Sequence, residues 1–312
     1  MSLTRTLLGR ATAVAAVGAL FAGAPAGAVS AGTHALAPSA GAHPADAPNC
    51  TRHVSGQHAL DTVQPGDVVC VDDLSADERL KIDKGGTADE PVTYAGHGAR
   101  VGGIDIEADH VIVEGYTMEE PSAPGIEVYG DDVTVQDNTV TAPQGGDGDG
   151  LRFFGDHITI RNNTISQTDN STGAHADCMQ TFATDDHNTA SRHAVIDGNR
   201  CLDIDNMCLM AEGPNSEAGD GSGEGVSEYW TFSNNECETL EASQALMVDD
   251  VQHLTVTGNT WKAGPDHAVG LQNHSTHAHV KDNDLDPSIA CEVGIDESSL
   301  EGYEGPEPGC DP

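Results

Sequence analysis

The chain has 312 residues, with 13 Lys or Arg against 51 Asp or Glu, so its formal net charge at pH 7 is −38. Nucleic acids and anionic membranes are bound mainly through Lys and Arg, and this charge therefore excludes both as partners. It also repels anionic polysaccharides unless a cation intervenes. A surface of this kind is equally typical of proteins that stay hydrated in concentrated salt.

Residues 1–28 have the pattern of a secretory signal peptide, in which Arg5 and Arg10 precede an apolar run that ends in Ala-Gly-Ala. We therefore expect a secreted, extracellular protein. Residues 29–47 are rich in Ala, Pro and Gly without periodicity, and they predict a flexible lead-in to one domain at 48–312. No later segment is apolar enough over a sufficient length to predict a membrane span.

An eight-residue pattern then recurs, with three strand-forming residues, two polar residues and an Asn. Its copies are 111–118, 133–140, 158–165, 194–201, 230–237, 254–261 and 278–285. Six copies share the Asn, at spacings of 25, 36, 36, 24 and 24 residues: Asn138, Asn163, Asn199, Asn235, Asn259 and Asn283. The first copy has Tyr116 instead. Short alternating segments, each followed by a polar turn, indicate half-buried strands repeated once per coil.

A second series of short alternating segments lies between these copies, at 124–132, 149–156, 177–186, 207–214, 244–250 and 268–274. Two short strands per unit of about 24 residues, with an Asn at one turn, predict a right-handed parallel β-helix over about 85–290. An Asn in a left-handed bend can bond to its counterpart on the next coil. A β-sandwich also has many short strands, but it would not need Asn at one phase in six units.

With these repeats the chain resembles the pectate-lyase-like superfamily of secreted right-handed β-helix proteins. The resemblance implies an all-β solenoid that acts on carbohydrate. Catalysts of this superfamily cleave acidic polysaccharides by β-elimination, with bound Ca²⁺ and a Lys or Arg base, or by hydrolysis with paired carboxylates. The chain departs from the polygalacturonase motifs, because its Gly-His-Gly at 96–98 comes too early, and it lacks the Trp-Val-Asp-His of one pectate lyase group.

Eight cysteines in an exported chain indicate disulfides rather than zinc ligands, because the compartment is oxidising and no Cys-x-x-Cys pair is present. Two pairs of cysteines occupy equivalent positions in successive repeats, and stacked positions on neighbouring parallel strands lie about 4.8 Å apart. We therefore predict two disulfides between repeats and one at each end: Cys178–Cys208, Cys201–Cys237, Cys50–Cys70 and Cys291–Cys310.

The alternation in the second series separates inward from outward side chains. One outward column contains Glu127, Arg152, Gln180, Met210, Met247 and Gly270, and the next contains Tyr129, Phe154, Phe182, Glu212, Asp249 and Gln272. Three adjacent aromatic residues in the second column are typical of a platform for sugar rings, unless a long insertion covers them. We expect substrate to be bound by Tyr129, Phe154, Gln180, Phe182 and Gln272.

Glu212 and Asp249 follow the aromatic residues on neighbouring coils, about 5 Å apart by strand spacing. Such a pair can divide into an acid and a base or can share a Ca²⁺ ion. The same pair can equally be two solvated acids on an acidic surface. Two coils have 36 residues, and the additional residues around 184–193 and 213–228 are expected to wall a cleft beside the columns.

In this cleft Arg152 is expected to neutralise a uronate carboxylate or to take up a proton. His175 is a candidate acid or base near neutral pH, and Asp177 follows it. The sequence thus predicts a monomeric polysaccharide lyase that acts on a uronate polymer, with Ca²⁺ as the one suggested cofactor. The alternatives are a glycoside hydrolase that uses Glu212 and Asp249, and a non-catalytic β-helix that binds glycans at the cell surface.

Overall fold

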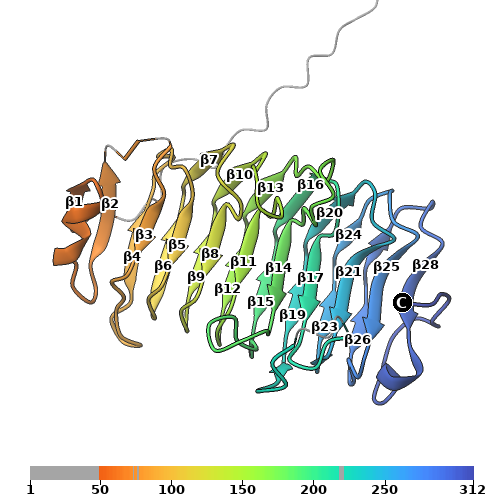
Figure 1. The fold of residues 1–312 in the computed structure, drawn as a ribbon. Coiled ribbons are helices and arrows are strands. Elements are labelled where there is room, and N and C mark those ends of the chain that lie inside the picture. The colour runs from red at the N-terminus through yellow and green to blue at the C-terminus, as the bar shows by residue number, and fades with distance from the viewer. Residues whose placement is uncertain (1–48, 73, 76, 218–220) are drawn as a thin grey trace, which may run out of the picture. The chain divides into compact units, whose positions relative to one another are not determined.

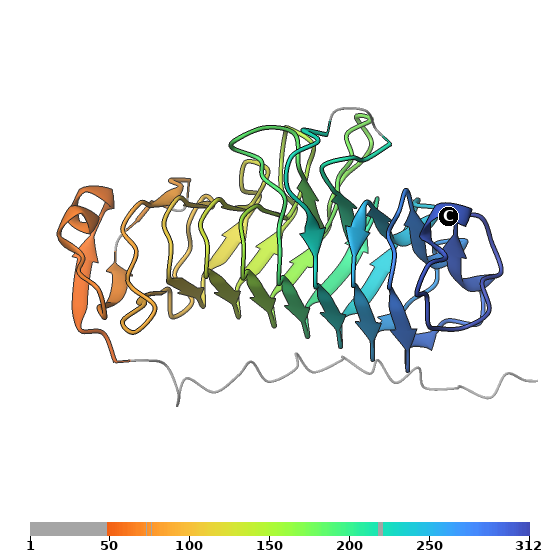
Figure 2. The same ribbon diagram turned by 90° about the horizontal axis from the view of Figure 1, so that it is seen from below.

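The computed structural model describes residues 49–72, 74–75, 77–217 and 221–312; the predicted signal peptide and lead-in lie outside the described residues. The described chain winds into successive coils, and the strands of stacked coils pair in parallel in three long sheets (Figures 1 and 2). The predicted all-β, right-handed parallel β-helix is confirmed. The described helices are two 3₁₀ segments, η2 (Gln57–Thr62) and η3 (Glu297–Ser299).

The strands of each sheet follow one another in chain order. The ten-stranded sheet contains β1 (Arg52–Ser55), β2 (Val68–Asp72), β4 (Val92–Ala95), β6 (Val111–Glu114), β9 (Thr134–Gln136), β12 (Thr159–Arg161), β15 (Val195–Asp197), β19 (Thr231–Ser233), β23 (Thr255–Thr257) and β26 (His279–Lys281). The seven-stranded sheet contains β7 (Thr117–Glu119), β10 (Thr139–Thr141), β13 (Thr164–Ser166), β16 (Arg200–Ile204), β20 (Glu236–Thr239), β24 (Thr260–Trp261) and β27 (Asp284–Leu285).

The third sheet has nine strands and corresponds to the second series of repeats. It contains β3 (Leu80–Ile82), β5 (Ile104–Ile106), β8 (Ile126–Val128), β11 (Leu151–Phe153), β14 (Met179–Phe182), β17 (Leu209–Glu212), β21 (Gln244–Asp249), β25 (His267–Gln272) and β28 (Cys291–Ile295). A two-stranded pair, β18 (Ser227–Glu228) and β22 (Val251–Gln252), completes the set.

Most coils therefore contain three strands rather than the two that the sequence predicted. Each copy of the eight-residue pattern bends at its centre and supplies one strand to each of two sheets. Asp137, for example, has φ 56° and separates β9 from β10. The left-handed residue is thus the one that precedes the shared Asn, where Asp, Asn or Gly tolerates a positive φ.

The shared Asn residues form the predicted ladder through the interior. Each amide Nδ2 donates to Oδ1 of the Asn on the next coil, over 3.0–3.1 Å, from Asn138 through to Asn283. Tyr116 takes the first place, and its backbone N–H donates to Asn138 Oδ1 at 3.0 Å. The ladder satisfies buried polar groups at every turn, which a buried corner requires.

The predicted inward columns of the nine-stranded sheet form the core. One column of residues in register is at most 1% exposed: Ile126, Leu151, Met179, Leu209, Leu246 and Val269. The next inward column is also buried: Val128, Phe153, Thr181, Ala211, Val248 and Leu271. Because one face of every strand packs against this core, the register of the strands determines which side chains face outward.

The prediction for the four central cysteines is wrong. Disulfides join Cys178 to Cys201 and Cys208 to Cys237, with Cα–Cα distances of 5.8 and 5.9 Å, instead of joining Cys178 to Cys208 and Cys201 to Cys237. Cys201 and Cys237 do lie opposite each other on β16 and β20. Their side chains point the same way, however, because neighbouring parallel strands present equivalent positions side by side. Cys201 and Cys237 therefore bond to the cysteines directly before β14 and β17, Cys178 and Cys208.

The disulfides at the two ends are confirmed. Cys50–Cys70 ties the segment before β1 to β2, and Cys291–Cys310 ties the C-terminal segment to β28. These bonds hold the outermost strands, whose free edges would otherwise be able to pair with another chain.

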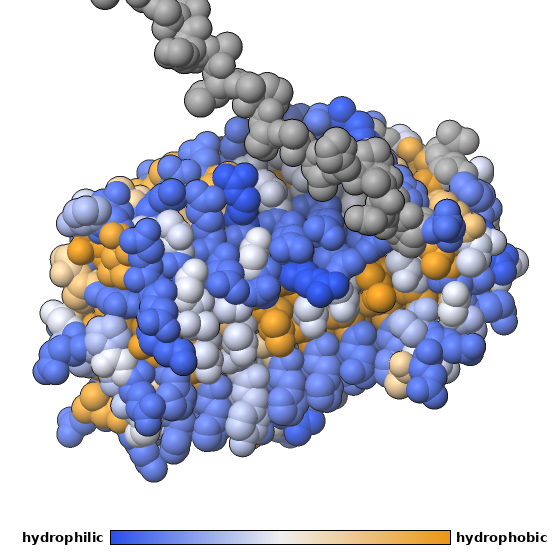
Figure 3. Space-filling view, turned by 180° about the vertical axis from the view of Figure 1, so that it is seen from behind, coloured by the Kyte–Doolittle hydropathy of each residue, from blue (hydrophilic) through white to orange (hydrophobic). Residues whose placement is uncertain are grey.

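Hydrophilic residues cover most of the face that Figure 3 shows, and hydrophobic residues appear there in narrow patches. Within the part of the chain that the structure describes, no helix is both long and apolar enough to cross a membrane.

Candidate functional site

The outer face of the nine-stranded sheet carries the predicted outward columns in register. The first column begins two strands earlier than the sequence repeats suggested, because Lys81 and Asp105 pair with each other, and Asp105 pairs with Glu127. Both segments, Leu80–Ile82 and Ile104–Ile106, alternate inward and outward as the later strands do. That alternation is the signal by which the sequence could have placed Lys81 and Asp105 on this face.

Two long loops follow the strands in the middle of this sheet, as predicted. Residues 183–194 follow β14, and 213–217 with 221–226 follow β17; Figure 2 shows green and teal loops rising together from the middle coils. A cavity of about 570 Å³ lies between these loops and the neighbouring turns. It is lined by Arg192, which is paired with Asp156 at 2.6 Å, and by six carboxylates: Asp131, Asp156, Asp185, Asp186, Glu224 and Glu228.

The aromatic column is packed rather than open. Phe154 is 1% exposed, because Tyr129 stacks on it at 5.1 Å between ring centroids and Phe182 meets it edge-on at 5.0 Å. The ring of His187, from the first long loop, stacks on Tyr129 at 3.9 Å. At Tyr129 the expected sugar platform is therefore covered by the insertion, as in the alternative interpretation of the sequence. Phe154 is a core residue of this cluster, and Phe182 is half-buried beside Arg152.

Arg152 lies on the outer face and is held by two carboxylates. Its Nε donates to Asp149 at 2.7 Å and its Nη2 to Asp147 at 2.5 Å, while the guanidinium lies 5.5 Å from the centre of the Phe182 ring. Burial alone would lower the pKa of Arg152, but the charges and hydrogen bonds of Asp149 and Asp147 raise it. Arg152 is thus a fixed cation and does not suit the alternative role of proton acceptor.

Gln180 follows Arg152 in the same column, in register on β14. Its side chain is 6% exposed, and its Nε2 lies 3.4 Å from the sulfur of Met210. Its Oε1 has no hydrogen-bond partner within the described part of the chain. A buried acceptor without a partner beside a fixed cation is a natural contact for a ligand hydroxyl group.

Asp177 lies in the corner of the coil and not in the cleft. It is fully buried, and its Oδ1 accepts hydrogen bonds from the backbone N–H of Met207 at 2.8 Å and from Asn206 Nδ2 at 2.9 Å. Burial, and then the neighbouring charge of Asp149, raises the pKa of Asp177 well above its usual range. Asp177 therefore holds the corner of the next coil in place, which corrects its expected position at the cleft.

The predicted site residues are divided between the two ends of the strands. His175 is exposed and precedes β14, whereas Glu212 and Asp249 are the last residues of β17 and β21. A four-residue strand spans about 10 Å. The structure therefore does not bring His175 together with the two carboxylates, and Arg152 and Gln180 lie between them.

Glu212 and Asp249 pair directly across neighbouring strands, as predicted. Asp249 is 1% exposed and accepts hydrogen bonds from three groups: the backbone N–H of Glu217 at 3.0 Å, Gln272 Nε2 at 3.1 Å and Asn273 Nδ2 at 2.9 Å. Asp249 thus anchors the start of the second long loop, and the amide of Gln272 is occupied by it. Glu212 is half-buried beside it.

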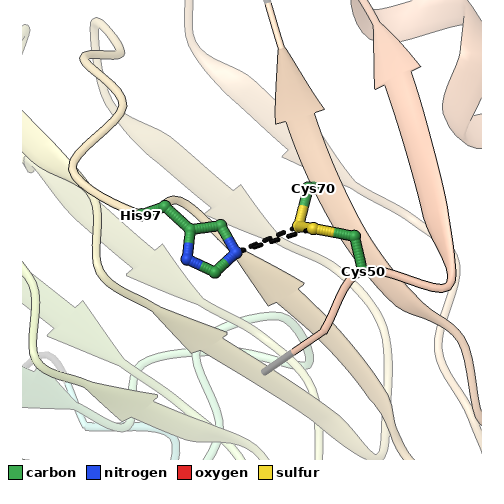
Figure 4. Close-up of side chains that lie close together, drawn as sticks. All are labelled: Cys50, Cys70 and His97. Carbon is green, nitrogen blue, oxygen red and sulfur yellow. Dashed lines mark hydrogen bonds between the residues drawn. A yellow bond between two sulfur atoms is a disulfide. The ribbon is translucent and has the colours of Figure 1, made fainter. Parts of the chain in front are cut away.

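The Glu212–Asp249 pair does not fit Ca²⁺ in this arrangement, because Ca²⁺ takes six to eight oxygen ligands and the Asp249 oxygens already accept three donors. Among the described residues, one group of three His, Cys, Asp or Glu side chains brings its ligand atoms within 4.8 Å: Cys50, Cys70 and His97. Figure 4 shows that the two sulfurs of this group form a disulfide, with His97 Nε2 at 3.1 Å from Cys70 Sγ. Disulfide sulfurs are not the thiolates that metals bind.

A second cavity, of about 330 Å³, adjoins the aromatic cluster on its N-terminal side. Its titratable and aromatic lining comes from Arg79, Asp105, Glu107, Glu127, Tyr129 and His187. Arg79 Nη2 contacts Asp105 Oδ1 at 2.5 Å, and the hydroxyl group of Tyr129 donates to Glu127 at 2.8 Å. Burial, and then this hydrogen bond to Glu127, raises the pKa of Tyr129. Except for Tyr129, these side chains were not among the predicted site residues.

A family model described as the right handed beta helix region matches residues 102–285. No curated protein matches the chain. Among solved structures, a pectate lyase from Bacillus sp. N165 in complex with trigalacturonate is similar at 11% identity, over 81% of this chain and 79% of that one, with a TM-score of 0.50. An alginate lyase from Paenibacillus sp. str. FPU-7 is similar at 16% identity, over 79% and 99%, with a TM-score of 0.45. At these identities the likeness extends to the fold alone.

Proposed function

The chain belongs to the right-handed beta helix family, and from that premise we propose that it is an extracellular protein that binds a polysaccharide on the outer face of the nine-stranded sheet. We further propose that it cleaves a uronate-containing chain there by β-elimination. The four disulfides fit an oxidising, extracellular location. The similar pectate lyase structure, which is a complex with trigalacturonate, gives the fold a precedent for a glycan ligand.

The observation that carries the proposal is the pairing of a fixed cation with an unpartnered acceptor. Arg152 is held on the outer face by two carboxylates, and its contacts with them use Nε and Nη2. Gln180, its neighbour in register, has a buried Oε1 with no partner among the described residues. A uronate residue offers a carboxylate for the guanidinium and hydroxyl groups for the Gln180 oxygen.

In β-elimination a base removes the proton at C5 of the uronate, the C4–O4 bond breaks and a C4=C5 double bond forms. The leaving O4 takes a proton from solvent. Arg152 would stabilise the negative charge that develops on the uronate carboxylate. Glu212, half-buried at the end of β17 on the same face, is the group that we assign as proton acceptor.

The experiment is to incubate the purified protein with polygalacturonate, alginate and chondroitin, and to follow ultraviolet absorbance of unsaturated products and then reducing ends. We expect new absorbance with at least one uronate polymer, and its loss in Arg152→Gln and Glu212→Gln. Arg161→Gln is the matched control, because Arg161 is an exposed arginine on the ten-stranded sheet that donates to Gln136. Full activity in both site variants would refute the assignment.

A glycoside hydrolase is the second candidate, favoured by the cross-strand pairing of Glu212 with Asp249. Reducing ends without ultraviolet absorbance would support hydrolysis. Asp249 suits this role poorly, because its carboxylate accepts three hydrogen bonds that tie it to the loop and to its neighbours. If neither product forms on a broad panel while glycan binding is measurable, the protein is a non-catalytic binder.

A further inference from the structure

The contact between His187 and Tyr129 joins a long surface loop to the rigid sheet. The two rings stack at 3.9 Å between centroids with an interplanar angle of 21°. The opposite face of Tyr129 is covered by Phe154 at 5.1 Å. His187 is exposed and belongs to the loop 183–194, whereas Tyr129 directly follows strand β8. His187 therefore occupies the one face of the Tyr129 ring that a ligand can reach.

A pyranose ring can make the same kind of contact, because the C–H groups on one side of the sugar form an apolar face that packs flat on an aromatic ring. The cavity of about 330 Å³ borders both Tyr129 and His187 and lies within the size range of small-molecule sites. If the loop 183–194 moves, a sugar ring can therefore replace the His187 imidazole on Tyr129 without any change in the sheet.

The charges around this cavity select the kind of sugar. Its wall contains three carboxylates, Asp105, Glu107 and Glu127, which accept hydrogen bonds from hydroxyl or amino groups. The one arginine, Arg79, already contacts Asp105 and donates to the backbone carbonyls of Ser122 at 2.8 Å and Pro124 at 2.9 Å. A sugar carboxylate would meet excess negative charge here, whereas an uncharged or amino sugar would not.

We propose that the cavity beside Tyr129 is a subsite for a pyranose residue without a carboxylate, and that His187 holds the stacking position on Tyr129 until this sugar displaces it. The subsite lies one coil from the cation of the proposed lyase site, because Glu127 and Arg152 pair across β8 and β11. The inference rests on the proposed function only where it places the Tyr129 cavity and the Arg152 cation along one glycan. Together they fit a heteropolymer in which uronate and hexosamine residues alternate, rather than a pure polyuronate.

The test is calorimetric titration, at low ionic strength, with three trisaccharides: the neutral N-acetylglucosamine trimer, the cationic glucosamine trimer and trigalacturonate. In Arg152→Gln, which lacks the cation of the proposed lyase site, we expect the first two to bind at least tenfold more tightly than trigalacturonate. Removal of the stacked imidazole in His187→Ala should tighten binding of the neutral trimer about two- to tenfold, the range that one aromatic contact contributes. Tyr129→Ala should abolish that binding.

His157→Ala is the matched control, because His157 stacks on His193 at 4.9 Å and does not line this cavity. Equal melting temperatures of the variants and the wild type establish that each is folded. The proposal is overturned if no trimer binds either the wild type or His187→Ala, if His157→Ala gives the same gain, or if trigalacturonate binds best in Arg152→Gln.

The two proposals fail separately. If uronate polymers are cleaved through Arg152 but the His187 and Tyr129 variants bind and cleave like the wild type, the subsite is wrong and the lyase assignment stands. If no polymer is cleaved but the neutral trimer binds through Tyr129, the subsite stands and the lyase assignment is wrong.

Discussion

Replacement of Asn199 by Ala tests whether the Asn ladder holds the coils together. Asn199 makes four hydrogen bonds inside the molecule: its Nδ2 donates to Ile160 O at 2.9 Å and to Asn235 Oδ1 at 3.1 Å, and its Oδ1 accepts from the backbone N–H and Nδ2 of Asn163 at 2.9 and 3.0 Å. With a net contribution of about 1 kcal/mol per bond, the free energy of unfolding should fall by about 4 kcal/mol. The buried Asn163 donors that lose their acceptor can only add to this loss.

Asn283→Ala is the matched control at the C-terminal end of the ladder. Asn283 also takes part in four hydrogen bonds, with Asn259, Val256 and Glu292, but its side chain is only partly buried. Water can replace the two partners that the exposed side of the Asn283 amide loses, but the two donors of buried Asn259 lose their acceptor, so we expect a cost of about 2 kcal/mol. Urea unfolding of both variants gives the two values. An equal cost at the two positions, or a cost below about 1 kcal/mol at Asn199, would refute the argument from buried hydrogen bonds.

Three further outcomes are expected. Asp177→Asn should have a higher free energy of unfolding than the wild type at pH 7, and no higher near pH 3. Because the pKa of Asp177 is raised in the folded state, the free energy of unfolding of the wild type falls as pH rises above the ordinary Asp pKa near 3.9, whereas Asn does not titrate. Thermal melts across pH measure this, and lost activity at unchanged stability would instead favour catalysis by Asp177. Removal of Cys178 and Cys201 together should leave no free thiol by Ellman titration, whereas removal of Cys178 and Cys208 should leave two. Binding of acidic oligosaccharides should strengthen as salt rises from about 0.01 to 0.15 M, because screening shortens the reach of the protein's negative charge; a monotonic loss with salt would contradict this.

The fold was predictable because each coil is specified by a short local pattern of residues, and this pattern repeats along the chain. One turn residue, one Asn and three alternating residues recur at a fixed phase, so each coil predicts the next. The inward and outward columns followed from the same alternation, and the register of Glu212 with Asp249 followed from counting. The third sheet was missed because a single left-handed residue such as Asp137 bends a segment that reads as one strand.

The candidate site was only partly predictable, because its chemistry depends on contacts between coils. The sequence placed Asp177 beside His175, but the structure buries the first in a corner and exposes the second. Nothing in the sequence pairs Arg152 with both Asp147 and Asp149, although all three are close in the chain. His187 covers Tyr129 because of the path that its loop takes, and the repeat does not predict the path of a loop.

The sequence by itself determined the coil and the ladder, since both depend on residue type at a regular spacing. It also determined the acidic surface, which follows from composition, and the two end disulfides, whose cysteines lie near one another at each end of the chain. Only the tertiary structure decided how the central cysteines pair, which carboxylates are occupied and which aromatic faces are covered. The physical reason is that the local repeat sets the register of each strand on the next coil. Which side chains contact one another depends instead on the directions in which they point across the interior and on the paths of loops, and no repeat constrains these.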